Sequence, residues 1–295
     1  ENSYAELNGD PAKPLVNRSI NGDLYPPGSV FKVVTAAAAL STGDYTEDTV
    51  VPGPAILDLP QTDADLPNAF DGPCGPNDEV TMTEALAVSC NTAFASIGMD
   101  IGTEALQAQA AKFGFGDAIT IPMRVTPSTV PPEMNQPQLA QASIGQYDVR
   151  STPLQMAMVA AGVANQGAVM KPYLVQSVIG SDLSVIESAD PQELSQAVTP
   201  EVAAQLTRMM EAVVEDGSGR RAQIDGVAVA GKTGTAQHGE GRKAHAWFIS
   251  FAPADDPQIA VAVIAEDGGV AGSEAGGGAV AAPIAKRMME ARLDR

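Results

Sequence analysis

One lysine lies in a stretch of sequence where a charge is costly. Between positions 30 and 40 every residue is apolar except Lys32 and Thr35, a pattern that predicts a helix buried on nearly all sides. An ammonium group in such a helix must be paired, hydrogen-bonded or neutralised, so the Lys32 amine is a candidate base. Ser29 lies three residues earlier, on the same helical face and at the positive end of the helix dipole, which suits a nucleophile. The structural alternative is an N-capping serine and a lysine that extends to solvent.

Two further polar clusters could complete such a site. In Ser89-Cys90-Asn91 a hydroxyl and an amide flank a cysteine, a combination suited to relaying a proton and holding a substrate amide. This short segment means little by itself.

The third cluster is Lys232-Thr233-Gly234-Thr235, which lies in a predicted strand. Gly234 leaves room for the close approach of a ligand backbone. A cation and two hydroxyls along one strand suit an extended substrate that ends in a carboxylate, with one carbonyl oxygen directed at backbone amides. An ordinary strand containing a glycine remains the alternative.

Helices and strands must position these clusters. Apolar periodicity and capping residues predict helices at 81–98, 103–113, 151–165, 200–215 and 277–293. Alternation and turn residues predict strands at 173–179, 183–186, 226–237, 244–253 and 258–266, the last three as an antiparallel meander. Residues 1–25 are expected to form short strands and loops, 41–79 to be irregular, and the glycine-rich 268–278 to form a mobile connector.

An early helix must then pack on strands that come late in the chain. We therefore predict an α/β (α+β) fold, in which an antiparallel sheet flanked by helices carries an inserted, mostly helical subdomain. The sheet layer is assigned to residues 1–40 and 170–295 and the helical subdomain to 41–169, within one domain of 295 residues.

Composition excludes several classes of function. The formal net charge of −19 would repel nucleic acid. No apolar run approaches the ~18 residues that cross a bilayer. The chain holds two cysteines, too few for a zinc site, and its two histidines, His238 and His245, lie seven residues apart rather than at a ligand-like spacing. We therefore expect no metal and no cofactor.

Taken together and in this order, Ser29-Val30-Phe31-Lys32, Ser89-Cys90-Asn91 and Lys232-Thr233-Gly234 match the three motifs of penicillin-binding proteins and serine β-lactamases. The chain resembles the transpeptidase domain of class B penicillin-binding proteins over essentially its whole length, and is similar to the actinobacterial penicillin-binding protein A group. The flanking segments Tyr25-Pro26-Pro27-Gly28, Ser143-Ile144-Gly145-Gln146 and Ala246-Trp247-Phe248 carry the same resemblance.

The resemblance implies a role for each motif residue. Ser29 would be the nucleophile, Lys32 its base and Ser89 a proton relay, while Asn91, Lys232, Thr233, Gly234 and Thr235 would bind substrate and the backbone amides of Ser29 and Thr235 would form the oxyanion hole. The implied reaction is D,D-transpeptidation of peptidoglycan stem peptides ending in D-Ala-D-Ala through a Ser29 acyl-enzyme, with β-lactams acylating the same serine.

The resemblance also implies a setting and leaves two alternatives open. A membrane anchor and an amino-terminal domain would precede this chain, placing it on the extracytoplasmic face of the bacterial membrane with a glycosyltransferase partner. There, Cys74 and Cys90 would form a disulfide. A hydrolase (β-lactamase or D,D-carboxypeptidase) uses the same motifs, although Pro131 occupies the place of its water-activating glutamate and Glu133 lies two positions away. A β-lactam receptor that signals without turnover is the other alternative.

Overall fold

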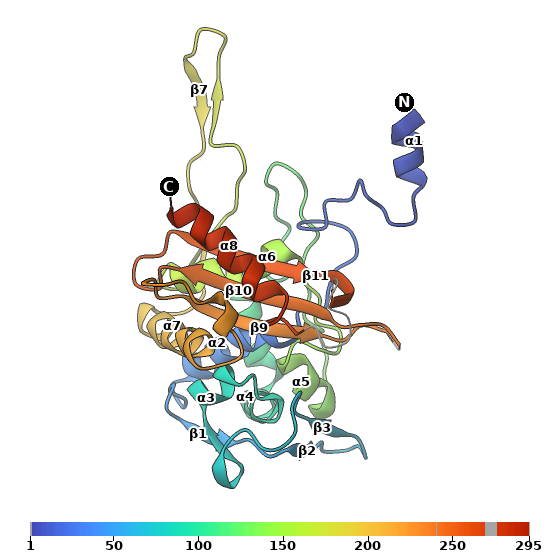
Figure 1. The fold of residues 1–295 in the computed structure, drawn as a ribbon, viewed down its shortest axis with the longest axis vertical. Coiled ribbons are helices and arrows are strands. Elements are labelled where there is room, and N and C mark those ends of the chain that lie inside the picture. Colours follow the sequence, from blue (N-terminus) through green and yellow to red (C-terminus); the bar gives the residue numbers. More distant parts are fainter. Residues whose placement is uncertain (1, 240, 269–275, 295) are drawn as a thin grey trace.

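A three-stranded antiparallel sheet forms one layer of the molecule (Figure 1). The computed structural model describes residues 2–239, 241–268 and 276–294. The strands are β9 (Ala230–Ala236), β10 (His245–Ala252) and β11 (Ile259–Ala265), in the order β11-β10-β9. They confirm the predicted meander. Strand β9 lies at one edge of this sheet, and no other described strand pairs with its outer edge, which can therefore face a ligand.

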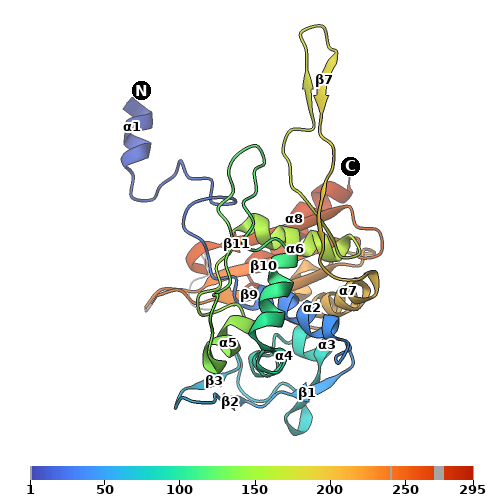
Figure 2. The ribbon, with the colours of Figure 1, turned by 180° about the vertical axis from the view of Figure 1, so that it is seen from behind.

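Helices cover both faces of this sheet. Helix α8 (Ala281–Leu293) lies on one face and α6 (Pro153–Ala164) on the other, as the two opposite views show (Figures 1 and 2). Every residue of β10 is consequently buried. Although we assigned α6 to the helical subdomain, it packs against β10 and β11. Helix α7 (Pro200–Glu215) contacts β9 as well as α3, so it joins the two layers.

The second layer is mostly helical. A short 3₁₀ helix, η1 (Gly28–Phe31), contacts β9 and leads directly into α2 (Lys32–Thr42), whose first nine residues are all buried. The other members are α3 (Met82–Ala87), α4 (Asn91–Lys112) and α5 (Gln136–Ser143). Helix α2 packs on α4 and α7. The early chain thus reaches the late strands through η1, and the predicted α/β fold class is confirmed.

Three expectations about local structure were wrong. The predicted 81–98 helix is broken between α3 and α4, because Ser89 has a φ of +63°, which lies outside the right-handed helical region. Residues 2–9 form helix α1 (Asn2–Gly9) rather than a strand or loop. The region 41–79 contains strands β1 (Val50–Pro52), β2 (Ile56–Asp58) and β3 (Asp65–Pro67), and β1 pairs with β4 (Glu79–Thr81).

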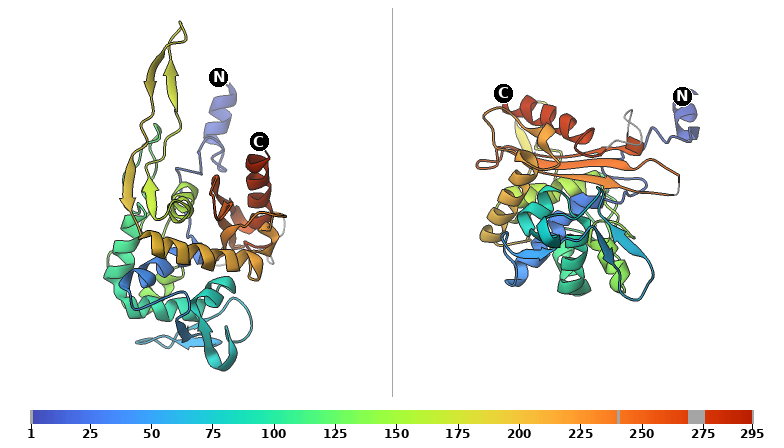
Figure 3. Two further views of the ribbon diagram at one scale, coloured as in Figure 1. Left: turned by 90° about the vertical axis from the view of Figure 1, so that its left-hand side faces the viewer. Right: turned by 60° about the horizontal axis from the view of Figure 1, so that its bottom comes forward.

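Two strand pairs extend from the layer of α6. Strand β5 (Ala168–Met170) pairs with β8 (Glu193–Gln196), and between them β6 (Ser177–Ile179) and β7 (Val185–Ser188) form a hairpin that projects far from the body (Figure 3). Short 3₁₀ turns at η2 (Pro76–Asp78) and η3 (Arg220–Ala222) complete the elements. No helix in the described ranges is long and apolar enough to cross a bilayer. The predicted connector at 268–278 falls mainly on residues 269–275, which lie outside the described residues.

Candidate active site

A cavity of about 750 Å³ opens where the two layers meet at the edge strand β9. Residues from all three motifs line it: Ser29, Ser89, Asn91, Thr233, Gly234 and Thr235. The sequence separates these residues by up to about 200 positions, and the fold brings every one of them to a single cavity. Lys32 and Lys232 are fully buried and lie beneath this surface.

Close backbone packing places Ser29 beside β9. Gly28, immediately before it, has a φ of +55° and donates its N–H to the Gly145 carbonyl at 2.9 Å. A β-carbon at Gly28 would come within 2.8 Å of the Thr235 carbonyl oxygen. Only glycine therefore lets η1 approach the strand so closely, and this approach sets the nucleophile candidate against the edge of the sheet.

The Lys32 amine contacts the second motif. Its Nζ donates to the Ser89 carbonyl at 2.7 Å and to Asn91 Oδ1 at 2.8 Å, and it lies 3.3 Å from Ser89 Oγ. Burial, and then the nearby charge of Lys232, hold the pKa of Lys32 well below its ordinary value. The lowered pKa favours the neutral amine, the form that can act as a base.

Lys232 approaches the same hydroxyl from the strand. Its Nζ donates to Ser89 Oγ at 2.9 Å and to the Thr233 carbonyl at 2.9 Å, and burial lowers the pKa of Lys232 to about 7. The Ser89 hydroxyl thus lies between two amines of lowered pKa. This arrangement can pass a proton in either direction.

Two contacts differ from what the motif spacing alone suggested. Among the described residues, no hydrogen bond joins Ser29 Oγ to the Lys32 amine, whose partners all come from residues 89–91. The amide of Asn91 is also engaged, since Oδ1 accepts from Lys32 and Nδ2 donates to the Pro67 carbonyl at 3.1 Å. In many enzymes the catalytic hydrogen bonds reach their final geometry only in the complex with substrate.

Sequence reasoning missed Asn68, which holds the second motif in place. Its Oδ1 accepts from the backbone amides of Asn91 at 3.0 Å and Thr92 at 3.2 Å, while its Nδ2 donates to the Pro54 and Gly72 carbonyls. Asn68 is only 8% exposed. It lies in a segment without apolar periodicity, so only its contacts across the fold reveal its role.

A disulfide and a hydroxyl pair brace the two walls of the cavity. Cys74 and Cys90 are bonded, with their Cα atoms 5.8 Å apart, which ties the loop after β3 to the Ser89 turn. On the opposite wall, Ser218 and Thr233 share a hydrogen bond of 2.6 Å between their hydroxyls. Ser218 lines the cavity, and no sequence motif marked it.

The family described as the penicillin-binding protein transpeptidase domain matches residues 1–290. The chain belongs to this family, as the three motifs at one cavity and the fold indicate.

Among individual proteins, the chain is similar to the peptidoglycan D,D-transpeptidase PbpA of Mycolicibacterium smegmatis, with 46% identity over 99% of this chain and 59% of that protein. It therefore spans less than two thirds of that relative's length. PbpA of Mycobacterium tuberculosis is 43% identical over the same share of each chain. A ceftriaxone acyl-enzyme structure of penicillin-binding protein A from M. tuberculosis superposes with a TM-score of 0.94 at 42% identity, covering 99% of this chain and 66% of that one.

Proposed function

We propose that this chain is a D,D-transpeptidase that cross-links peptidoglycan stem peptides through an acyl-enzyme on Ser29. The observation that carries the proposal is the Ser89 hydroxyl, held between two buried amines of lowered pKa in a cavity that Ser29 also lines. The names of the relatives, peptidoglycan D,D-transpeptidases, support the same reaction.

Acylation begins when Ser29 Oγ attacks the carbonyl carbon of the penultimate D-Ala and its proton passes to the neutral Lys32 amine. This step requires a hydrogen bond between Ser29 and Lys32 in the substrate complex, where catalytic hydrogen bonds commonly tighten. The peptide C–N bond then breaks, and the departing D-Ala amine takes the proton from Lys32 through the Ser89 hydroxyl. Lys32 is neutral again and the acyl group is esterified to Ser29.

Transfer runs the same path in reverse. An amine from a neighbouring stem peptide attacks the ester carbonyl and gives its proton through Ser89 to Lys32. The ester C–O bond breaks, Ser29 Oγ takes the proton back, and an amide cross-link is released. In both steps the backbone amides of Ser29 and Thr235 receive the oxyanion, and Thr233, Gly234 and Thr235 hold the substrate along the free edge of β9.

A β-lactam would acylate the same serine; the M. tuberculosis relative forms acyl-enzyme complexes with ceftriaxone and with penicillin G. Hydrolysis of the adduct needs a base that activates water. Glu133 is exposed and is not among the described residues that line the cavity, which favours transfer over hydrolysis. The whole protein, by analogy with its longer relatives, would act on the outer face of the cell membrane beside a glycosyltransferase.

The test combines labelling with transfer. A fluorescent penicillin should label the chain one-to-one, with mass mapping to Ser29, and Ser29→Ala should abolish labelling whereas the exposed Ser41→Ala should not. Lys32→Ala should slow acylation by at least ~10²-fold. The wild type should then transfer a stem peptide ending in D-Ala-D-Ala to an acceptor amine.

Three other outcomes would contradict the proposal. An adduct on another serine contradicts the motif assignment. Release of the free acid without amide formation makes the chain a hydrolase, and labelling without either product makes it a receptor.

A further inference from the structure

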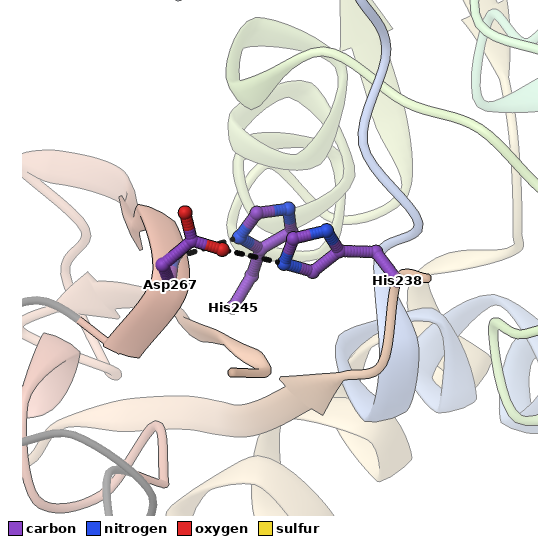
Figure 4. A group of neighbouring side chains, drawn as sticks. All are labelled: His238, His245 and Asp267. Carbon is purple, nitrogen blue, oxygen red and sulfur yellow. Dashed lines mark hydrogen bonds and ion pairs between the residues drawn. The ribbon is translucent and has the colours of Figure 1, made fainter. Parts of the chain in front are cut away.

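A second cavity, of about 510 Å³, adjoins the candidate active site, and the two share Tyr147 and Gln237 as lining residues. One wall of the second cavity carries both histidines of the chain, His238 and His245, together with Asp267 (Figure 4). The proposed transpeptidase mechanism uses none of these three side chains.

The three residues come from the ends of neighbouring strands. His238 follows β9, His245 begins β10, and Asp267 follows β11. The two imidazole rings stack with their centroids 3.5 Å apart and their planes within 7°. His238 Nε2 lies 2.9 Å from Asp267 Oδ1. The hairpin turn thus brings together two histidines that are seven residues apart in the sequence.

The spacing of the donor atoms suits a metal ion. One atom from each of the three side chains lies within 4.8 Å of the others. Ligand atoms around a tetrahedral zinc ion, with bonds of 2.0–2.1 Å, are about 3.3 Å apart. Because the stacked rings lie in nearly parallel planes, their in-plane lone pairs do not converge, so coordination of one ion requires the less buried His238 ring to turn out of the stack.

The hydrogen bonds of the three side chains indicate which of their atoms could coordinate a metal ion. The backbone N–H of Asp267 donates to His245 Nδ1 at 3.1 Å, so that nitrogen is unprotonated, and an ion bound there would replace this hydrogen bond. His238 Nε2 faces two oxygens, Asp267 Oδ1 and the Lys243 carbonyl, each at 2.9 Å, so it carries the proton that a metal ion would displace. Arg242 holds Asp267 Oδ2 at 3.2 Å and reaches Oδ1 at 3.4 Å, the kind of outer partner that orients a ligating carboxylate.

We propose that His238, His245 and Asp267 bind one divalent transition-metal ion of the zinc class. Two imidazoles and a carboxylate are ligands that zinc favours, and three protein ligands leave a fourth position for water from the cavity. The ion ties the turn between β9 and β10 to the end of β11. It thereby braces the strand that carries Lys232 and Thr235, and the proposal does not depend on the reaction at Ser29.

The test uses tag-free protein stripped with a chelator. The chain holds two histidines, and both of its cysteines are in the disulfide, so histidine-dependent binding reports this site alone. Zn²⁺ titrated in a calorimeter should bind at one ion per chain with a Kd of about 1 μM or below. Co²⁺ should give the visible absorption of a tetrahedral site.

Substitutions at the more accessible ligands decide the assignment. His238→Gln and Asp267→Asn should each weaken Zn²⁺ binding at least ~10-fold. Asp23→Asn removes the same charge from a 91% exposed carboxylate of the same cavity and should leave the affinity unchanged. Thermal unfolding in chelator checks that each variant folds, and either ligand variant suffices if the other does not fold.

Two results would overturn the proposal. One is the absence of calorimetric heat and of the Co²⁺ band at millimolar metal. The other is a folded His238→Gln or Asp267→Asn variant that binds Zn²⁺ as tightly as the Asp23→Asn control.

Discussion

Replacing Lys232 by glutamine should shift the pH dependence of acylation, because its charge helps to keep Lys32 neutral. Both amines touch Ser89 Oγ, at 3.3 and 2.9 Å, so they are at most the sum of these distances, 6.2 Å, apart. Two unit charges at that separation repel each other by about 2.7 kcal/mol at an effective dielectric constant of ~20. This energy, a lower bound because 6.2 Å is the largest possible separation, favours the neutral form of Lys32 about 100-fold while Lys232 is charged.

The direction of the change depends on which protonation form of Lys32 the repulsion disfavours. A second cation disfavours protonated Lys32, so removing it raises the pKa of Lys32 and leaves less free base at a given acidic pH. The acid limb of the acylation rate should therefore move to higher pH in Lys232→Gln, which lowers the rate on that limb by about 10²-fold or more. Lys232 loses its own charge as the pH rises through about 7, so the shift is largest below neutrality.

The assay is the second-order rate of labelling by a fluorescent penicillin, measured from pH 5 to 10. Lys171→Gln, which removes the same charge from an exposed position, is the matched control and should keep the wild-type profile. Urea unfolding at each pH separates loss of activity from loss of fold. An acid limb that stays in place in Lys232→Gln, or moves to lower pH, would refute the reasoning.

Three further results are expected. Asn68→Ala should slow acylation about tenfold, because it leaves the backbone amides of the second motif without their acceptor; Asn68→Asp keeps that acceptor, and an equal loss in both variants would assign the effect to the Nδ2 contacts instead. Replacing Cys74 and Cys90 by serine should lower the free energy of unfolding in urea by roughly 3 kcal/mol, the chain-entropy value for a loop of this size; an unchanged urea midpoint would contradict it. The penicilloyl adduct on Ser29 should persist for hours by mass spectrometry in wild type and Glu133→Gln alike, and clearance that Glu133→Gln abolishes would place that carboxylate at the ester.

Local patterns in the sequence determined much of the fold. The buried helix at 30–40, the helix at 200–215 and the three-stranded meander were predicted because apolar periodicity and turn residues act over a few neighbouring positions. The order of three motifs also indicated the family, since each motif is weak alone and their combination is specific.

Other features depended on contacts between distant segments. The break at Ser89 falls among weak helix formers, residues 88–92, but its position is decided by the contacts that hold the Ser89 hydroxyl between two lysines. Asn68 lies in a segment with no periodic signal, and only its hydrogen bonds to the second motif identify it.

The two histidines show most clearly where the sequence stops being informative. Histidines that bind one metal ion from the same helix are about three or four residues apart, so a spacing of seven predicted no metal site. No other short-range pattern in the sequence indicates that the two side chains meet. In the folded chain a hairpin stacks the two rings, and a third strand brings Asp267 to them. Which side chains meet across strands is decided by strand pairing and by the direction in which each side chain leaves the backbone, and these are properties of the tertiary structure.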